Sequence, residues 1–137
     1  MSTQSLTRYV PRSARQTLTR IIDGTAPWVA IGDFVDGWNR SDLLARERMI
    51  LEPTPATDVA EIRRWAALIA ATIDWLAWNA EPDRITPPAW VDGEEFVLPR
   101  PWFLYPGWRL RMHQLVDTPA PFKRRNIFGG DRILARA

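Results

Sequence analysis

The stretch from Asp58 to Ala80 constrains the fold most, because it is the longest unbroken helical pattern in the chain and is apolar almost all round. At about 100° per residue, its large apolar side chains fill one broad arc. That arc contains Ile62, Trp65, Leu68, Ile69, Ile73, Trp75 and Leu76. The strip left for water is narrow and contains Arg63, Ala67, Ala70 and Asp74. Such a helix is normally the buried centre of a domain, so we predict that the other segments pack around it.

The composition is that of a soluble, single-domain protein. With 137 residues, 46% of them hydrophobic and 25% charged, the chain can form one ordinary core. The absence of cysteine excludes disulfides, thiolate metal sites and cysteine nucleophiles. No segment has the roughly 18 apolar residues of a membrane span, and the first residues lack the apolar run of a signal sequence. We therefore expect a cytoplasmic protein.

Residues typical of helix starts and helix ends predict two helices ahead of the central one. Ser13 followed by Gln16 has the capping-box spacing, and Gly24 is a typical residue just beyond a helix end. Pro27 is typical of a first helical position, and large apolar residues recur at helical spacing over 27–40.

Two more helix starts follow. Ser41 or Asp42 is expected to cap a helix over LLARERMIL, residues 43–51. Asp58 with Glu61 repeats the capping-box spacing, which predicts the start of the central helix.

The character of the chain changes after Glu81. Residues 81–106 contain six prolines and several aromatic residues without helical periodicity, which predicts a largely extended wrap. A helix is expected to return at 107–117. Its predicted inner stripe consists of Trp108, Met112, Leu115 and Val116.

The C-terminal end allows two interpretations. Thr118 before Pro119 predicts a short helix, and Asp131 is expected to cap a last helical turn. Alternatively, residues 125–128 and 132–134 form a hairpin across the Gly-Gly pair. Taken together, the patterns predict an all-α fold, a single-domain helical bundle around one buried central helix with a proline- and aromatic-rich extended wrap. Residues 1–12 are expected to be a flexible arm, and 13–137 the helical domain.

Charge is strongly segregated along the chain. Residues 1–32 carry a net charge of +3, residues 33–97 of −7, and residues 98–137 of +6. The basic ends can pair with the acidic middle inside the fold, or present a basic face to nucleic acid or to an acidic protein.

The sequence offers no constellation that predicts an enzyme. His113 is the only histidine, which excludes a histidine-rich metal site, and its helical neighbours Arg109 and Asp117 favour an exposed ion-pair ladder. Asp33 and Asp36 share one helix side, yet acids at this spacing are usually solvated surface. We predict a non-enzymatic protein without a metal or other cofactor.

Two segments are candidate binding sites. The aromatic wrap could present a stacking surface, for which Trp90, Trp102 and Tyr105 are the candidates, or its rings could simply cover the tryptophans of the central helix. The second is the basic segment 122–132, with partner-binding candidates Phe122, Lys123, Arg124, Arg125, Phe128 and Arg132. The alternative for this segment is that an arginine pairs internally, for example with Asp33 or Asp74.

The chain resembles a family of small uncharacterised bacterial proteins of about this length. The resemblance lies in WVAIGDFVDGW (28–38), WAALIAATIDWLAW (65–78), PPAWV (87–91), LPRPWFLYPGWRLR (98–111) and TPAPFKRRNIFGGDRILARA (118–137). The ending is also similar to the C-terminal part of bacterial helix-turn-helix, antitoxin-like regulators, which are often paired with a nucleotidyltransferase-like protein. Unlike them, this chain has no evident helix-turn-helix segment at its N-terminus.

This resemblance implies an antitoxin-like protein-interaction module that regulates or neutralises a protein partner, such as a nucleotidyltransferase-like toxin. The alternative function is a nucleic-acid-binding accessory protein that uses the basic C-terminal segment and the first helix. If the basic segment binds the partner, replacing both Arg124 and Arg125 with glutamate should abolish binding and leave the melting temperature nearly unchanged.

Overall fold

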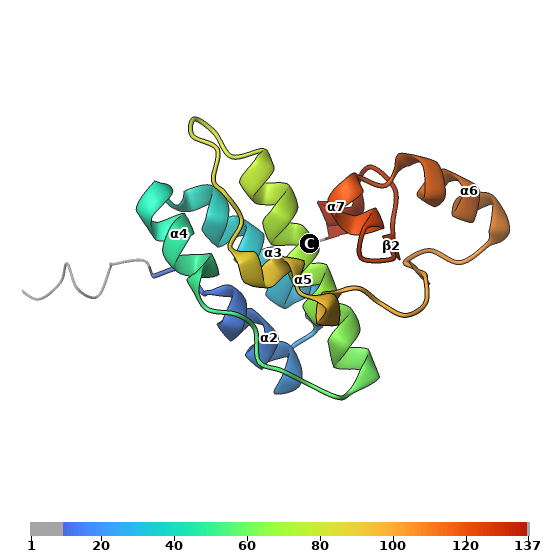
Figure 1. The fold of residues 1–137 in the computed structure, drawn as a ribbon, viewed down its shortest axis with the longest axis horizontal. Coiled ribbons are helices and arrows are strands. Elements are labelled where there is room, and N and C mark those ends of the chain that lie inside the picture. The colour runs from blue at the N-terminus through green and yellow to red at the C-terminus, as the bar shows by residue number, and fades with distance from the viewer. Residues whose placement is uncertain (1–9, 137) are drawn as a thin grey trace, which may run out of the picture.

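The computed structural model describes residues 10–136, and within them the fold is mostly helical, as predicted (Figure 1). The predicted arm over residues 1–12 lies largely outside the described residues. The α-helices are α2 (Ala14–Ile22), α3 (Pro27–Arg40), α4 (Leu43–Leu51), α5 (Ala60–Trp78), α6 (Trp108–Asp117) and α7 (Ala120–Lys123). The 3-10 helices are η1 (Ala89–Asp92), η2 (Glu94–Phe96) and η3 (Ile133–Arg136), and the strands are β1 (Trp102–Phe103) and β2 (Ile127–Phe128).

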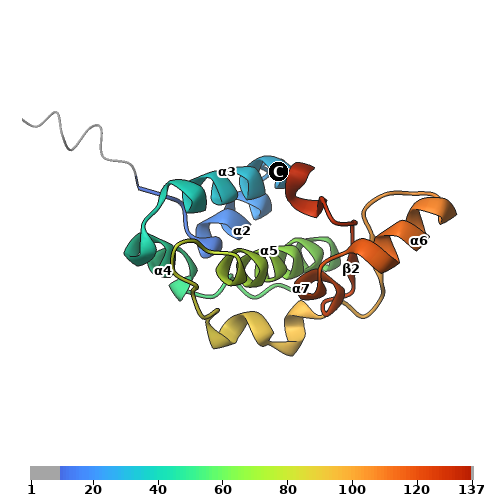
Figure 2. The ribbon, with the colours of Figure 1, turned by 90° about the horizontal axis from the view of Figure 1, so that it is seen from above.

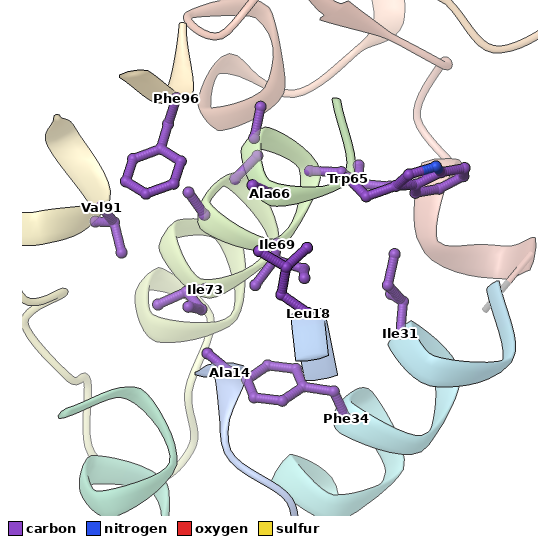
Figure 3. Close-up of a cluster of buried hydrophobic side chains, with 14 of the residues drawn as sticks. Ala14, Leu18, Ile31, Phe34, Trp65, Ala66, Ile69, Ile73, Val91 and Phe96 are labelled. Carbon is purple, nitrogen blue, oxygen red and sulfur yellow. The ribbon is translucent and has the colours of Figure 1, made fainter. Parts of the chain in front are cut away.

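Helix α5 is packed on two sides. It contacts α2 on one side and η1, η2 and α7 on the other, so it lies between two layers in Figure 2. Side chains from both layers meet it: Leu18 and Phe34 come from α2 and α3, whereas Val91 and Phe96 come from η1 and η2 (Figure 3). Burial of each such side chain contributes roughly 1.5–3 kcal/mol, which makes these contacts the main source of stability.

The predicted water strip on this helix is wrong. Ala67, Ala70 and Asp74 are all buried, and only Arg63 of the predicted strip is exposed. The 3-10 helices and α7 cover this side, and the Asp74 carboxylate is compensated by arginines from beyond α7. The sequence pattern had treated the aspartate as solvated because its partners are about fifty residues away.

The local helix signals of the N-terminal half are confirmed. The Ser13 hydroxyl accepts from the Gln16 N–H at 3.1 Å, and the Gln16 side chain accepts from the Ser13 N–H at 2.9 Å. Gly24 has a φ of 106°, which a side chain would disfavour, and Pro27 opens α3. Asp42 caps α4 by accepting from the N–H of residue 45.

The predicted cap of α5 is wrong. The helix begins after Val59, whose N–H donates to the Thr57 hydroxyl. Glu61 does not reach back to the helix start, because its carboxylate accepts from the Trp65 indole N–H at 3.2 Å. The capping box predicted that the Glu61 carboxylate would accept from the backbone N–H of Asp58. The indole N–H of Trp65, one turn further along the helix, takes that place.

The last third of the chain is held by a short parallel strand pair. β1 pairs with β2 in the register Trp102↔Ile127. The alternative Gly-Gly hairpin is therefore wrong, since β2 pairs with β1 and the chain after Gly130 forms η3. The predicted last helical turn around Ile133 is confirmed as a 3-10 turn.

Candidate functional site

The two aromatic anchors of the basic segment belong to the core. Phe122 is completely buried and Phe128 is almost so, and the ring of Phe128 stacks on Phe103 with centroids 5.1 Å apart. Helix α7, which carries Phe122, packs on α5. Both rings are therefore core side chains in this fold, and their role in binding a partner stays a prediction.

Arg125 is also part of the interior. The residue is 3% exposed, and its guanidinium donates to the Asp74 carboxylate at 3.1 Å and to the carbonyls of Pro121 at 2.6 Å and Val91 at 2.9 Å. Asp92 lies 3.5 Å away. This is the internal pairing with Asp74 that was left open as an alternative, and it is confirmed.

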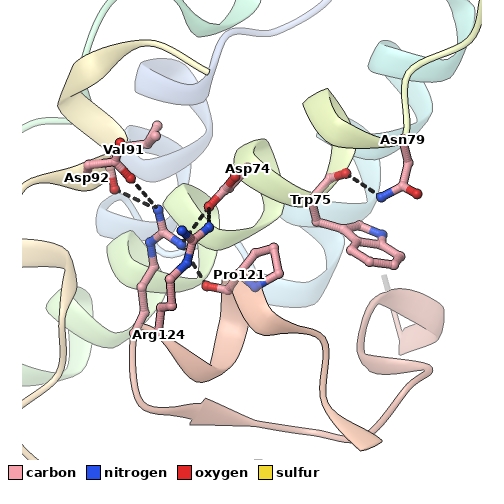
Figure 4. Close-up of polar contacts among 8 residues, drawn as sticks. Asp74, Trp75, Asn79, Val91, Asp92, Pro121 and Arg124 are labelled. Carbon is pink, nitrogen blue, oxygen red and sulfur yellow. Dashed lines mark hydrogen bonds and ion pairs between the residues drawn. The ribbon is translucent and has the colours of Figure 1, made fainter. Parts of the chain in front are cut away.

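Burial determines the electrostatics of this cluster. Loss of water lowers the pKa of Arg125, while the hydrogen bond and charge of Asp74 act in the opposite direction. The exposed Arg124 pairs with the same Asp74 oxygen, as Figure 4 shows. The cluster therefore ties the segment after α7 to α5 and η1.

The two other basic candidates remain near or at the surface. Lys123 is half-buried and donates to the Val116 carbonyl at the end of α6, at 2.9 Å. Arg132 is exposed. The predicted six-residue site is thus divided between the core and the surface, and the structure does not bring it together as one patch.

The candidate aromatic surface is also dispersed. Trp90 donates its indole N–H to the Ile50 carbonyl at 2.9 Å, and Trp102 packs edge-on against Trp65 with centroids 5.1 Å apart. Tyr105 is half-buried and its backbone is held by Gln114. Trp90 and Trp102 each anchor the wrap at a different place, so they do not form one stacking platform.

The feature that sequence reasoning missed is the orientation of α6. Its predicted inner stripe points to solvent, and we call these four residues the α6 face. Their exposed fractions are 73% for Trp108, 57% for Met112, 42% for Leu115 and 68% for Val116. At about 100° per residue they fall within one arc of about 100°, so they form a continuous apolar stripe. The helix stands at one end of the molecule, against β2 (Figure 1).

A polar side chain explains why the helix is turned this way. Gln114, on the opposite side, is buried and its amide accepts from the Tyr105 N–H at 3.1 Å and donates to the Tyr105 carbonyl at 3.2 Å. Thr118 is buried as well, and its hydroxyl accepts from the N–H groups of Gly129 and Gly130. These irregular segments need such partners because buried backbone groups are costly when unpaired. The hydrogen bonds of Gln114 and Thr118 therefore fix the polar side of α6 against the protein, and the apolar side of the helix faces solvent.

Basic side chains border the α6 face. The guanidinium of Arg109 lies 5.9 Å from the ring of Trp108, and that of Arg111 lies 5.2 Å from the ring of Phe103. On the polar side of the helix, the Nδ1 atom of His113 lies 2.6 Å from the Asp117 carboxylate, so one of the two contacts of the predicted ladder is present. The result is an apolar stripe with a positively charged rim.

Within residues 10–136, no group of three or more histidine or acidic side chains is arranged to hold a metal ion. None of the helices in this range has both the length and the hydropathy that crossing a membrane requires.

A comparison with known protein families, curated proteins and solved structures gives no significant match.

Proposed function

We propose that this protein is a non-enzymatic, antitoxin-like interaction module that binds and regulates a protein partner through the α6 face. The observation that carries the proposal is the outward stripe of Trp108, Met112, Leu115 and Val116. A continuous exposed apolar stripe on a soluble domain usually marks a contact site. Tryptophan and arginine are enriched among the residues that dominate the energy of protein interfaces, and here Trp108 of the stripe has Arg109 beside it at the border.

The rim of the stripe indicates the chemistry of the partner. Arg109 and Arg111 flank the stripe, and Lys123 lies at its end. A complementary surface is an amphipathic helix whose apolar side is bordered by aspartate or glutamate. The same basic rim opposes pairing with a second copy of this chain. A nucleotidyltransferase-like toxin, suggested by the C-terminal resemblance, remains one candidate for the protein that carries this helix.

The alternative of nucleic-acid binding has less support, because many of its basic residues are already paired. Arg125 and Arg124 bond to Asp74. In the first helix, Arg20 pairs with Asp33 at 2.8 Å, and Arg15 donates to the Pro53 carbonyl at 3.1 Å. The carboxylates of Asp74 and Asp33 neutralise positive charge that phosphate binding would need, and the bond to Pro53 holds the Arg15 side chain in place.

Substitutions on α6 test the proposal. The protein partner that co-purifies from the native cell is identified, and its affinity for the purified chain is measured by calorimetry. We expect Trp108→Glu and Met112→Glu each to weaken binding at least about 100-fold, which is the range of an interface hot spot. Melting temperatures should change little, because both side chains are exposed.

Trp78→Glu is the matched control. Trp78 is 55% exposed on α5, and the guanidinium of Arg84 lies 5.9 Å from its ring, the same separation as between Arg109 and Trp108. The control should bind like the natural chain. Equal losses for the Trp78 and Trp108 variants would refute the assignment to α6.

The alternative function is tested by the nature of the complex. Co-purified nucleic acid, with a binding constant whose logarithm falls linearly with the logarithm of the salt concentration, would favour the alternative function.

A further inference from the structure

A second candidate site lies on the side of the molecule where the link between α4 and α5 faces η1 and η2. The link residues 53–58, the first turns of α5 and the two 3-10 helices enclose a pocket of about 400 Å³. This volume is within the range of small-molecule sites. None of its lining residues belongs to α6, so the pocket is separate from the proposed partner-binding face.

An unsatisfied hydroxyl borders this pocket. Thr54 lines it and is only 6% exposed, and among the described residues no hydrogen-bond partner meets its side-chain oxygen. Buried hydroxyls are normally paired, so this one costs stability in the ligand-free protein. The oxygen itself is buried in the pocket wall, so a molecule in the pocket can supply the missing partner only after rotation about the χ1 bond, which exchanges hydroxyl and methyl positions.

The walls of the pocket are apolar and its rim carries both signs of charge. Trp90 and Phe96 meet edge-on with centroids 5.6 Å apart and, with Ala66, provide an apolar wall. Arg63 and Glu95 are exposed charged residues of the lining, and their charges are opposite. Asp58 adds a second carboxylate. A purely anionic or cationic ligand would meet a like charge here, whereas a zwitterion would satisfy both.

We propose that this pocket binds a small zwitterion with an apolar side chain, such as a free amino acid. The carboxylate pairs with Arg63, the ammonium group pairs with Glu95 or Asp58, and the side chain lies against Trp90 and Phe96. The Thr54 hydroxyl gains its hydrogen bond from a polar atom of the ligand. The proposal does not depend on the function proposed for α6.

Three related probes test the ligand class by ligand-observed NMR titration: L-phenylalanine, 3-phenylpropionate, which lacks the ammonium group, and 2-phenylethylamine, which lacks the carboxylate. We expect phenylalanine to bind at least about tenfold more tightly than either analogue, as expected for loss of one well-placed charged contact. Arg63→Gln should weaken phenylalanine binding, whereas Arg64→Gln, the neighbouring arginine outside the lining, should not. Equal binding of all three probes, or no binding up to about 10 mM, would overturn the proposal.

Thr54→Val separates a ligand site from a merely structural residue. Valine keeps the shape and removes the unpaired hydroxyl, so the ligand-free variant should melt at a higher temperature than the natural chain. The same variant should bind phenylalanine at least about tenfold more weakly, because it cannot make the hydrogen bond. A variant that is less stable, or that binds as well as the natural chain, contradicts the role assigned to Thr54.

Discussion

Replacing Asp74 with alanine is expected to lower the free energy of unfolding by about 3 kcal/mol, because it leaves a buried guanidinium without its counter-ion. The side chains of Asp74 and Arg125 are each 4% exposed. Arg125 would keep the carbonyls of Pro121 and Val91 and the more distant Asp92, which places the expected loss at the lower end of the usual range for a broken buried pair. Urea denaturation, with the slope compared between variants, measures the change.

Arg124→Ala is the control for this prediction. Arg124 bonds to the same carboxylate, but its side chain is 57% exposed, so its loss should cost no more than about 1 kcal/mol. A loss for Asp74→Ala as small as that expected for Arg124→Ala would show that the buried arginine does not depend on Asp74. The expectation that glutamate at both 124 and 125 leaves the melting temperature unchanged is withdrawn, since glutamate at 125 would face Asp74 within the core.

The truncation of Phe122 to alanine should lower the free energy of unfolding by about 3–5 kcal/mol, the usual cost of removing a fully buried aromatic ring. Phe122 is 0% exposed, and its helix packs on α5. The melting temperature should fall by about 10 °C or more for a domain of this size. Thermal unfolding followed by circular dichroism measures the shift.

Lys123→Ala is the neighbouring control. It removes one surface hydrogen bond to the Val116 carbonyl and should change stability by less than about 1 kcal/mol. A Phe122→Ala protein with natural stability and lost partner binding would restore Phe122 as an interface anchor. A protein destabilised as predicted supports its place in the core.

The sequence predicted those features that depend on residues a few positions apart. The capping box of Ser13 and Gln16, the stop at Gly24 and the cap at Asp42 were all found, because each is a contact within one helical turn. The cap at Asp58 failed because Trp65, in the same helix, offers Glu61 a competing partner.

The candidate site was harder to predict because it depends on contacts between distant segments. The periodicity of Trp108, Met112, Leu115 and Val116 showed that they share one side of a helix, and this is confirmed. Periodicity does not say which side faces the core. Here the need of the Tyr105 backbone for hydrogen bonds selects the polar side, through Gln114.

The basic segment illustrates the same limit. A run of lysine and arginine predicts exposure, and Arg124 and Arg132 follow that rule. Arg125 does not, because Asp74 lies beside it in the fold although the two are 51 positions apart. The segregation of charge along the chain left internal pairing open as one of two alternatives, and it did not identify which arginine would be buried.

Photo-crosslinking from α6 tests the central claim most directly. A benzophenone amino acid is placed at Met112 or, as control, at Leu51, which is 71% exposed on α4, and each protein is irradiated with its purified partner. We predict a crosslink to the partner from position 112 and none from position 51, with the crosslinked partner residues on an amphipathic helix bordered by acidic side chains. A complex that forms normally but crosslinks only from position 51 would contradict the assignment of the binding surface to α6.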